Sequence, residues 1–224
     1  MPLLPGLGTR KPLRMPLHQT IIVNPATKIL LWKVTESYEE LCAQVQLKDK
    51  SAIRVSGMKS ESHRRGFLSV RKLLHEVGYT DFDLHYDAFG KPYLEDGTHI
   101  SISHSHEFAA IILSDHVTGI DLEMRRDKIA YIADRFLSEG EMLYLDRQAT
   151  HYINKLTVLW GIKEVVFKIR NEPGISFKEH VNADDFDMSA CATTAYLHMD
   201  AIRKTYKVYF TEVENFTLVY AFDH

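Results

Sequence analysis

Residues 156–169 constrain the fold of this chain most. At about 100° per residue, one side of a helix through this segment is wholly apolar, made of Leu159, Ile162, Val165, Val166 and Ile169. The other side mixes large apolar and charged side chains, namely Leu156, Trp160, Lys163, Glu164, Phe167 and Lys168. A helix with apolar residues on both sides is packed on both sides. An exposed Glu164–Lys168 pair at i,i+4 would leave the aromatic side chains unexplained, so we expect Glu164 and Lys168 in a walled cleft.

The first part of the chain predicts a hairpin followed by helices. Residues 20–34 read as two strands around the turn-forming Asn24–Pro25 dipeptide. Residues 37–47 have helical spacing behind Ser37, with Glu40 three residues later as in a capping box. Residues 60–79 repeat apolar positions at three and four residues and end at a glycine, which predicts a second helix.

The middle of the chain carries an apolar run that is followed by acidic residues. We expect residues 108–123 to form an antiparallel hairpin, with its connection at 114–118. Because side chains alternate across a strand, Asp121 and Glu123 would share one face while their apolar neighbours anchor the other face in the core.

The helices and antiparallel strands predict an α+β fold class, and the length allows one large domain or two small lobes. Residues 1–18 are expected to be a disordered extension. Residues 174–222 alternate strand-like segments with polar turns, as antiparallel sheets do.

Composition excludes several function classes. The net charge of -3 gives no basic field for nucleic acid. Cys42 and Cys191 are far apart and form no CxxC pair, which argues against a disulfide framework or a structural zinc site. No run approaches the ~20 apolar residues that span a bilayer, and the N-terminus lacks the apolar section of a secretory signal. We therefore expect a cytoplasmic protein with neither nucleic acid nor membrane as partner.

Three carboxylates form the strongest candidate site. Asp121 and Glu123 on one strand face repel each other unless a cation or protons separate them. Mg²⁺ prefers oxygen ligands and accepts one or two carboxylates together with substrate phosphates. Solvated edge carboxylates are the alternative for this pair alone, but Glu164 on the cleft-lining helix adds a third ligand and favours magnesium.

Histidines give a competing metal interpretation. His104 and His106 share a strand face, with His99 nearby, and could bind zinc. The pattern lacks a spaced second ligand cluster. A Ser103–His104 turn can instead meet a phosphate group through its hydroxyl, its backbone N–H groups and the imidazole.

Four ordered motifs then carry a family resemblance. FGKPYL, ISISHS, TGIDLE and LWGIKEVVFK, within roughly residues 60–170, resemble the signature of the 4'-phosphopantetheinyl transferase superfamily, in its longer, two-lobed surfactin-type class. The resemblance implies transfer of 4'-phosphopantetheine from coenzyme A to a serine of an acyl or peptidyl carrier protein, with Mg²⁺ as cofactor. It also implies two similar lobes of antiparallel sheet with packed helices, namely an N-terminal lobe over residues 19–105 and a C-terminal lobe over residues 106–224 that carries the metal site. The resemblance further implies a monomer whose partners are coenzyme A and the carrier protein.

The resemblance also implies roles for individual residues. It assigns the metal to Asp121, Glu123 and Glu164. It assigns coenzyme A to Arg64, Lys91, Ser103, His104 and Lys168. Glu164 and Lys168 would be the catalytic pair, and Arg64, aided by Arg65 or Lys59, would meet the 3'-phosphate.

The chain departs from the family pattern at two positions. Gly161 stands where Ser or Thr is frequent, and Val165 where Ala or Ser usually follows the glutamate. Neither residue is a proposed ligand, so only local helix packing is put in question, with Gly161 costing the helix up to ~1 kcal/mol relative to Ala.

Two other function classes use similar residues. A metal-dependent phosphoesterase or nuclease would also place Asp-x-Glu and Glu around Mg²⁺. A non-catalytic module that binds a carrier protein or a nucleotide would need no proton acceptor and would keep its function in a Glu164→Gln variant.

Overall fold

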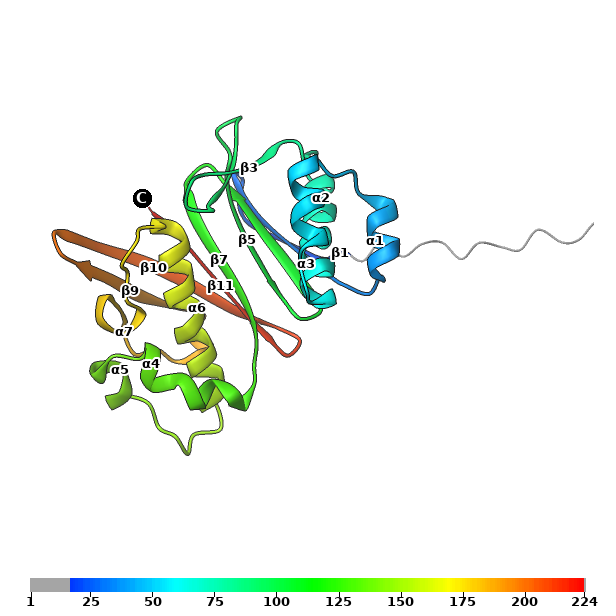
Figure 1. Ribbon diagram of the computed structural model, residues 1–224. Helices are drawn as coiled ribbons and strands as arrows, with labels where there is room; N and C mark the ends of the chain where they lie inside the picture. The colour runs from blue at the N-terminus through cyan, green and yellow to red at the C-terminus, as the bar shows by residue number, and fades with distance from the viewer. Residues whose placement is uncertain (1–16, 224) are drawn as a thin grey trace, which may run out of the picture.

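The computed structural model describes residues 17–223 and has an α+β fold of two main antiparallel sheets with packed helices, as predicted (Figure 1). One sheet has the strand order β1-β2-β6-β5 and the other the order β7-β11-β10-β9-β8. The predicted extension at residues 1–18 lies outside the described residues, apart from Leu17 and His18, which begin strand β1.

The first sheet contains the predicted hairpin of residues 20–34. Its strands are β1 (Leu17–Asn24), β2 (Thr27–Lys33), β5 (His99–Ser105) and β6 (Phe108–Ser114). A separate two-stranded sheet, β3 (Leu84–Tyr86) with β4 (Pro92–Leu94), leads into β5.

Three helices belong to this lobe: α1 (Tyr38–Gln44), α2 (Asp49–Ser56) and α3 (Glu61–His75). The capping box expected at the start of α1 is present, because Ser37 Oγ accepts from Glu40 N and the Glu40 carboxylate accepts from Ser37 N. Ser60 caps α3, whose apolar face packs on the sheet. Helix α2 was not predicted.

The second sheet confirms the predicted C-terminal strands. It consists of β7 (Val117–Met124), β8 (Val181–Ala183), β9 (Ala192–Met199), β10 (Ile202–Val213) and β11 (Phe216–Asp223). Around it lie η1 (Asp127–Ile132), α4 (Ala133–Phe136), α5 (Glu139–Leu143), α6 (Tyr152–Arg170), α7 (Phe177–His180) and η2 (Met188–Ala190). Within residues 17–223, no helix is both long and apolar enough to cross a membrane.

The prediction of a hairpin over residues 108–123 is wrong. Strand β6 pairs with β2 and β5, whereas β7 pairs with β11 in the other sheet. The run is apolar throughout because β6 is buried on both faces: Ala109 and Ile111 pack in the core under α3, and Ala110 and Ile112 pack in the core between the sheets. The chain therefore passes from the first sheet to the second after Ser114, and not at the predicted lobe boundary between residues 105 and 106.

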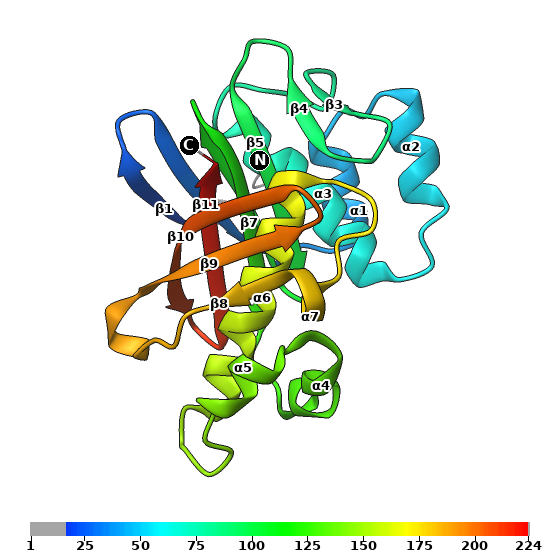
Figure 2. The same ribbon diagram turned by 90° about the vertical axis from the view of Figure 1, so that its left-hand side faces the viewer.

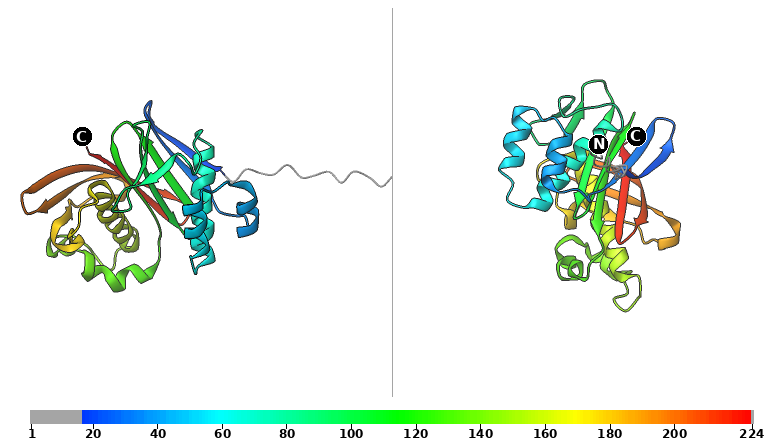
Figure 3. Two further views of the ribbon diagram at one scale, coloured as in Figure 1. Left: turned by 45° about the horizontal axis from the view of Figure 1, so that its top comes forward. Right: turned by 90° about the vertical axis from the view of Figure 1, so that its right-hand side faces the viewer.

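The two sheets meet where β5 and β7 run side by side between α3 and α6 (Figures 1, 2 and 3). Serine side chains join these two strands. Ile120 N donates to Ser101 Oγ and Leu122 N donates to Ser103 Oγ, both at 3.1 Å. This junction sets Ser103 directly beside Asp121.

Helix α6 lies very close to β7 and β11. A Cβ added at Gly161 would stand 2.6 Å from Val219 Cγ2, and one added at Gly119 would stand 2.6 Å from the Val165 carbonyl oxygen. Real Cβ atoms do not approach that closely, so both positions require glycine here. The chain has Gly161 where Ser or Thr is frequent in the family, because Val219 on the facing strand β11 fills the space that a side chain would need.

Candidate active site

A cavity of about 480 Å³ lies between the lobes. Most of the predicted site residues line it, namely Lys91, Ser103, His104, Asp121, Glu123, Glu164 and Lys168. They come from the β3–β4 connection, from β5 and β7 at the sheet junction, and from α6. The expectation that Glu164 and Lys168 stand in a walled cleft is confirmed.

Asp121 is the most enclosed carboxylate of the cavity, with 4% of its surface exposed. Its Oδ1 accepts from Lys168 Nζ at 2.8 Å and from Ser103 Oγ at 3.0 Å. Lys168 Nζ also donates to the Ile120 carbonyl oxygen at 2.8 Å. Asp121 Oδ2 is buried and has no partner among the described residues, so half of this carboxylate is unsatisfied.

The other two carboxylates are poorly compensated. Glu123 accepts a hydrogen bond from Ser105 Oγ at 3.1 Å, and burial followed by the charge of Asp121 raises its pKa. Glu164 makes no hydrogen bond or ion pair with residues 17–223. Burial, followed by the charge of Asp121, raises the pKa of Glu164 to about 7, against an opposing effect of Lys168. Of the three carboxylates, Asp121 alone has an ion-pair partner among the described residues, namely Lys168.

This donor set fits a hard divalent cation. Asp121 Oδ2 has no hydrogen-bond partner, and burial followed by the charge of Asp121 raises the pKa of Glu123 and of Glu164, so these carboxylate oxygens would be stabilised by a bound cation. Within the described part of the chain, no three His, Cys, Asp or Glu side chains already stand in a metal-binding arrangement. Lys168 is instead the cation on Asp121 Oδ1, and Asp121 Oδ2 is the oxygen left open to a metal.

Lys168→Met should therefore increase the affinity for Mg²⁺ in the absence of nucleotide. The variant removes a positive charge that competes for Asp121 Oδ1, and a unit charge at this range is worth roughly tenfold in affinity. Calorimetric titration with Mg²⁺ alone measures the change. Lys204→Met is the matched control, because Lys204 pairs with Asp223 at the same 2.8 Å outside the cavity. Unchanged or weaker binding in Lys168→Met contradicts this prediction.

His104 and Lys91 frame the rest of the cavity. His104 packs against α3, where a Cβ added at Gly66 would lie 3.0 Å from its ring. Desolvation, with smaller effects of His63 and Lys168, lowers the pKa of His104 and favours the neutral imidazole. Lys91 Nζ donates to the Ile169 carbonyl oxygen at 2.6 Å, which ties the β3–β4 connection to the end of α6.

The structure does not bring Arg64 into the cavity. Its Nε donates to the Met58 carbonyl oxygen at 2.6 Å and its guanidinium stacks over Tyr38, 5.6 Å from the ring centroid. Arg54 and Arg71 line the cavity instead. The sequence signal for Arg54 was the amphipathic spacing of α2, in which Ser51 and Val55 are buried.

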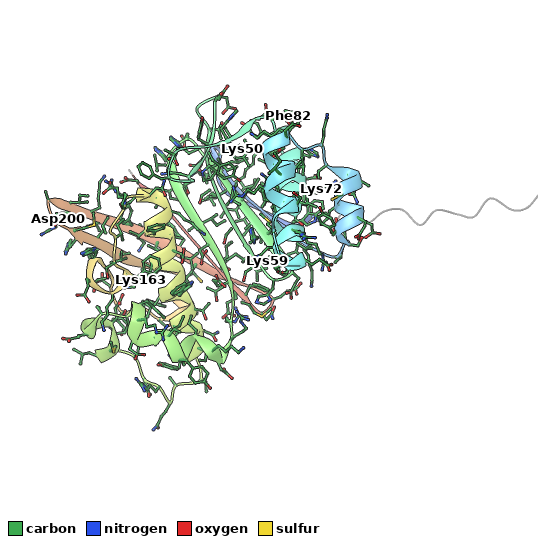
Figure 4. The ribbon with its side chains drawn as sticks, in the orientation of Figure 1. Lys50, Lys59, Lys72, Phe82, Lys163 and Asp200 are labelled. Atoms are coloured by element: carbon green, nitrogen blue, oxygen red, sulfur yellow. The ribbon has the colours of Figure 1, made fainter. Side chains whose placement is uncertain are left out.

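Lys163 is not part of the site, although the helical pattern places it beside Glu164. It is fully buried on the side of α6 that faces away from the N-terminal lobe (Figure 4). Its Nζ donates to both oxygens of Glu141, at 2.8 and 2.7 Å, and to the Val181 carbonyl oxygen. Lys163 therefore anchors α5 and β8 to the central helix.

Comparisons with known proteins support the resemblance seen in the motifs. A sequence profile of the 4'-phosphopantetheinyl transferase superfamily matches residues 117–220. The 4'-phosphopantetheinyl transferase gsp of Aneurinibacillus migulanus is 35% identical over 81 residues, which are 36% of this chain and 34% of that protein. The chain thus spans about a third of the length of the curated relative it matches. The resemblance is confirmed, and it is strongest over the lobe that carries Asp121, Glu123 and Glu164.

Proposed function

We propose that this chain, whose C-terminal lobe matches the 4'-phosphopantetheinyl transferase superfamily, transfers 4'-phosphopantetheine from coenzyme A to a serine of an acyl or peptidyl carrier protein. One observation carries the proposal: Asp121, Glu123 and Glu164 line the same inter-lobe cavity as Ser103, His104 and Lys168. A substrate with a diphosphate and a further phosphate needs both a metal-binding end and a cationic end. The carboxylates of this cavity would serve as the first, and its lysine and arginine side chains as the second.

In the proposed reaction the serine hydroxyl oxygen of the carrier attacks the β-phosphorus of coenzyme A. The bond from that phosphorus to the bridging oxygen breaks, and adenosine 3',5'-bisphosphate leaves with the electron pair. Glu164, which makes no hydrogen bond or ion pair with residues 17–223, would accept the hydroxyl proton, directly or through a water. Glu164 lines the same cavity as Asp121 and Lys168, which would position it at the reacting phosphate.

Asp121, Glu123 and Glu164 would hold Mg²⁺. When bound, the ion supplies charge stabilisation for the diphosphate oxygens. Lys168, released from Asp121, would donate to the diphosphate, and Ser103 keeps Asp121 oriented through the 3.0 Å hydrogen bond to Oδ1. His104 and Lys91 line the same cavity and would contact the nucleotide part of coenzyme A.

The metal-dependent phosphoesterase or nuclease remains the alternative from another class. It would use the same three carboxylates, release phosphate without an acceptor protein and show no special affinity for coenzyme A. The family match over residues 117–220 favours the transferase.

The intact mass of an apo carrier protein tests the proposal. After incubation with the protein, coenzyme A and Mg²⁺, the carrier should gain one phosphopantetheine group, and a carrier with Ala in place of its acceptor serine should gain none. Phosphate release from coenzyme A with no gain of mass across several carrier proteins would support the phosphoesterase. If neither phosphopantetheinylated carrier nor free phosphate forms, the result favours a non-catalytic binding module.

A further inference from the structure

Strand β5 carries three serines at alternate positions, Ser101, Ser103 and Ser105. Their partners on β6 are all buried in the core between the two sheets, namely Ile112, Ala110 and Phe108. Residues directly opposite each other in an antiparallel pair share one face of the sheet, so the three serines lie on the face that meets the second sheet. Buried hydroxyl groups on such an apolar face need hydrogen-bond partners.

The serines find their partners on β7. Strands β5 and β7 are each the last strand of their own sheet, and they run side by side (Figures 1 and 2). An edge strand presents backbone N–H groups that no ladder satisfies, and on β7 those of Ile120 and Leu122 donate to Ser101 Oγ and Ser103 Oγ. The two sheets are thus joined here through serine side chains.

Two serines of this row also donate to the carboxylates of β7. Ser103 Oγ donates to Asp121 Oδ1 at 3.0 Å, and Ser105 Oγ donates to Glu123 Oε2 at 3.1 Å. Within residues 17–223 the Glu123 carboxylate accepts no other hydrogen bond, so its Oε1 is left without a partner. Glu123 lines the cavity, whereas Ser105 does not. Ser105 can therefore act on a ligand in the cavity only through Glu123.

We propose that Ser105 is a positioning residue for the metal ligand Glu123: its hydroxyl holds Oε2 and leaves Oε1 as the oxygen available to the cation. The inference rests on the proposed function, in which Glu123 holds Mg²⁺. A hydrogen bond that fixes the glutamate side chain before the ion arrives reduces the conformational entropy lost on binding. Because Ser105 belongs to the first sheet and Glu123 to the second, the metal site is complete only where the two sheets are joined.

Calorimetric titration with Mg²⁺, in the absence and in the presence of coenzyme A, tests the assignment. Loss of a hydrogen bond behind a metal ligand should weaken Mg²⁺ binding about tenfold in Ser105→Ala, and Ser105→Thr, which keeps the hydroxyl, should stay within about twofold of the unaltered protein. Ser189→Ala is the matched control, because Ser189 Oγ also donates to a carboxylate, that of Asp187 at 2.6 Å, but outside the cavity. The control should bind Mg²⁺ like the unaltered protein.

The transfer reaction gives a second measurement. Ser105→Ala should need about tenfold more Mg²⁺ for its half-maximal rate, yet reach a turnover number within about twofold of the unaltered protein once Mg²⁺ is saturating.

A serine that only joins the sheets would lower the free energy of unfolding in urea and leave the Mg²⁺ affinity of the folded protein unchanged, and that result overturns the assignment. Mg²⁺ binding as weak in Ser105→Thr as in Ser105→Ala also overturns it, because the hydroxyl is then not responsible. Both results leave the transferase proposal standing. If the unaltered protein neither binds Mg²⁺ nor transfers phosphopantetheine, the proposed function fails as well.

Discussion

Glu164→Gln should lower the turnover number for phosphopantetheine transfer by roughly 10²–10⁴-fold, the usual worth of a positioned general base. Glutamine keeps the shape of the side chain but cannot accept a proton. The burial of Glu164 and the charge of Asp121 hold its pKa at about 7, and no described residue competes for its oxygens. The measurement is the rate of holo-carrier formation at saturating carrier and coenzyme A.

Because Glu164 is also a candidate metal ligand, the rate must be measured at saturating Mg²⁺, with metal affinity determined separately. Glu172→Gln is the matched control, since Glu172 pairs with Arg170 outside the cavity. Calorimetry with coenzyme A should confirm that the Glu164 variant is folded and binds the nucleotide. If the Glu164→Gln variant reaches the wild-type turnover number at saturating Mg²⁺, Glu164 acts in metal binding alone.

Local signals in the sequence predicted much of the fold. The Ser37–Glu40 capping box and the Asn24–Pro25 turn act within a few residues, so a short window contains their whole cause. The pairing partner of β6 was predicted wrongly, because an apolar run indicates burial on both faces of a strand but does not indicate which strands pair with it. Strand partners depend on contacts far apart in sequence, which periodicity does not contain.

The site residues also divide into those that local patterns predicted and those that depend on contacts far apart in the sequence. Asp121, Glu123, Glu164 and Lys168 were predicted to share a cleft because strand alternation and helical spacing fix where they point. Arg54 was missed since the position of its helix α2 depends on the contact of Ser51 with the buried Asp81, about thirty residues further along the chain. A basic residue near a motif could not by itself be placed inside or outside the cavity.

Lys163→Met should lower the free energy of unfolding by about 3–5 kcal/mol, the cost of removing one partner of a buried ion pair. Lys163 is 0% exposed and Glu141 1% exposed. The change leaves the Glu141 charge buried with only the backbone N–H groups of Ser138 and Ala183 as donors. Urea denaturation followed by circular dichroism measures the loss.

Lys155→Met is the control on the same helix, because Lys155 pairs at 2.7 Å with Asp185, whose side chain is 56% exposed. A pair with one exposed partner contributes up to ~1 kcal/mol. Adding Glu141→Gln to Lys163→Met should cost less than the sum of the single changes, since the second change removes the charge that the first left unpaired. If Lys163→Met keeps full stability but loses transfer, Lys163 acts on the substrate, and the side of α6 assigned to the cavity is wrong. If stability falls while the surviving folded protein binds coenzyme A normally, the lysine next to Glu164 serves to hold the helix in place.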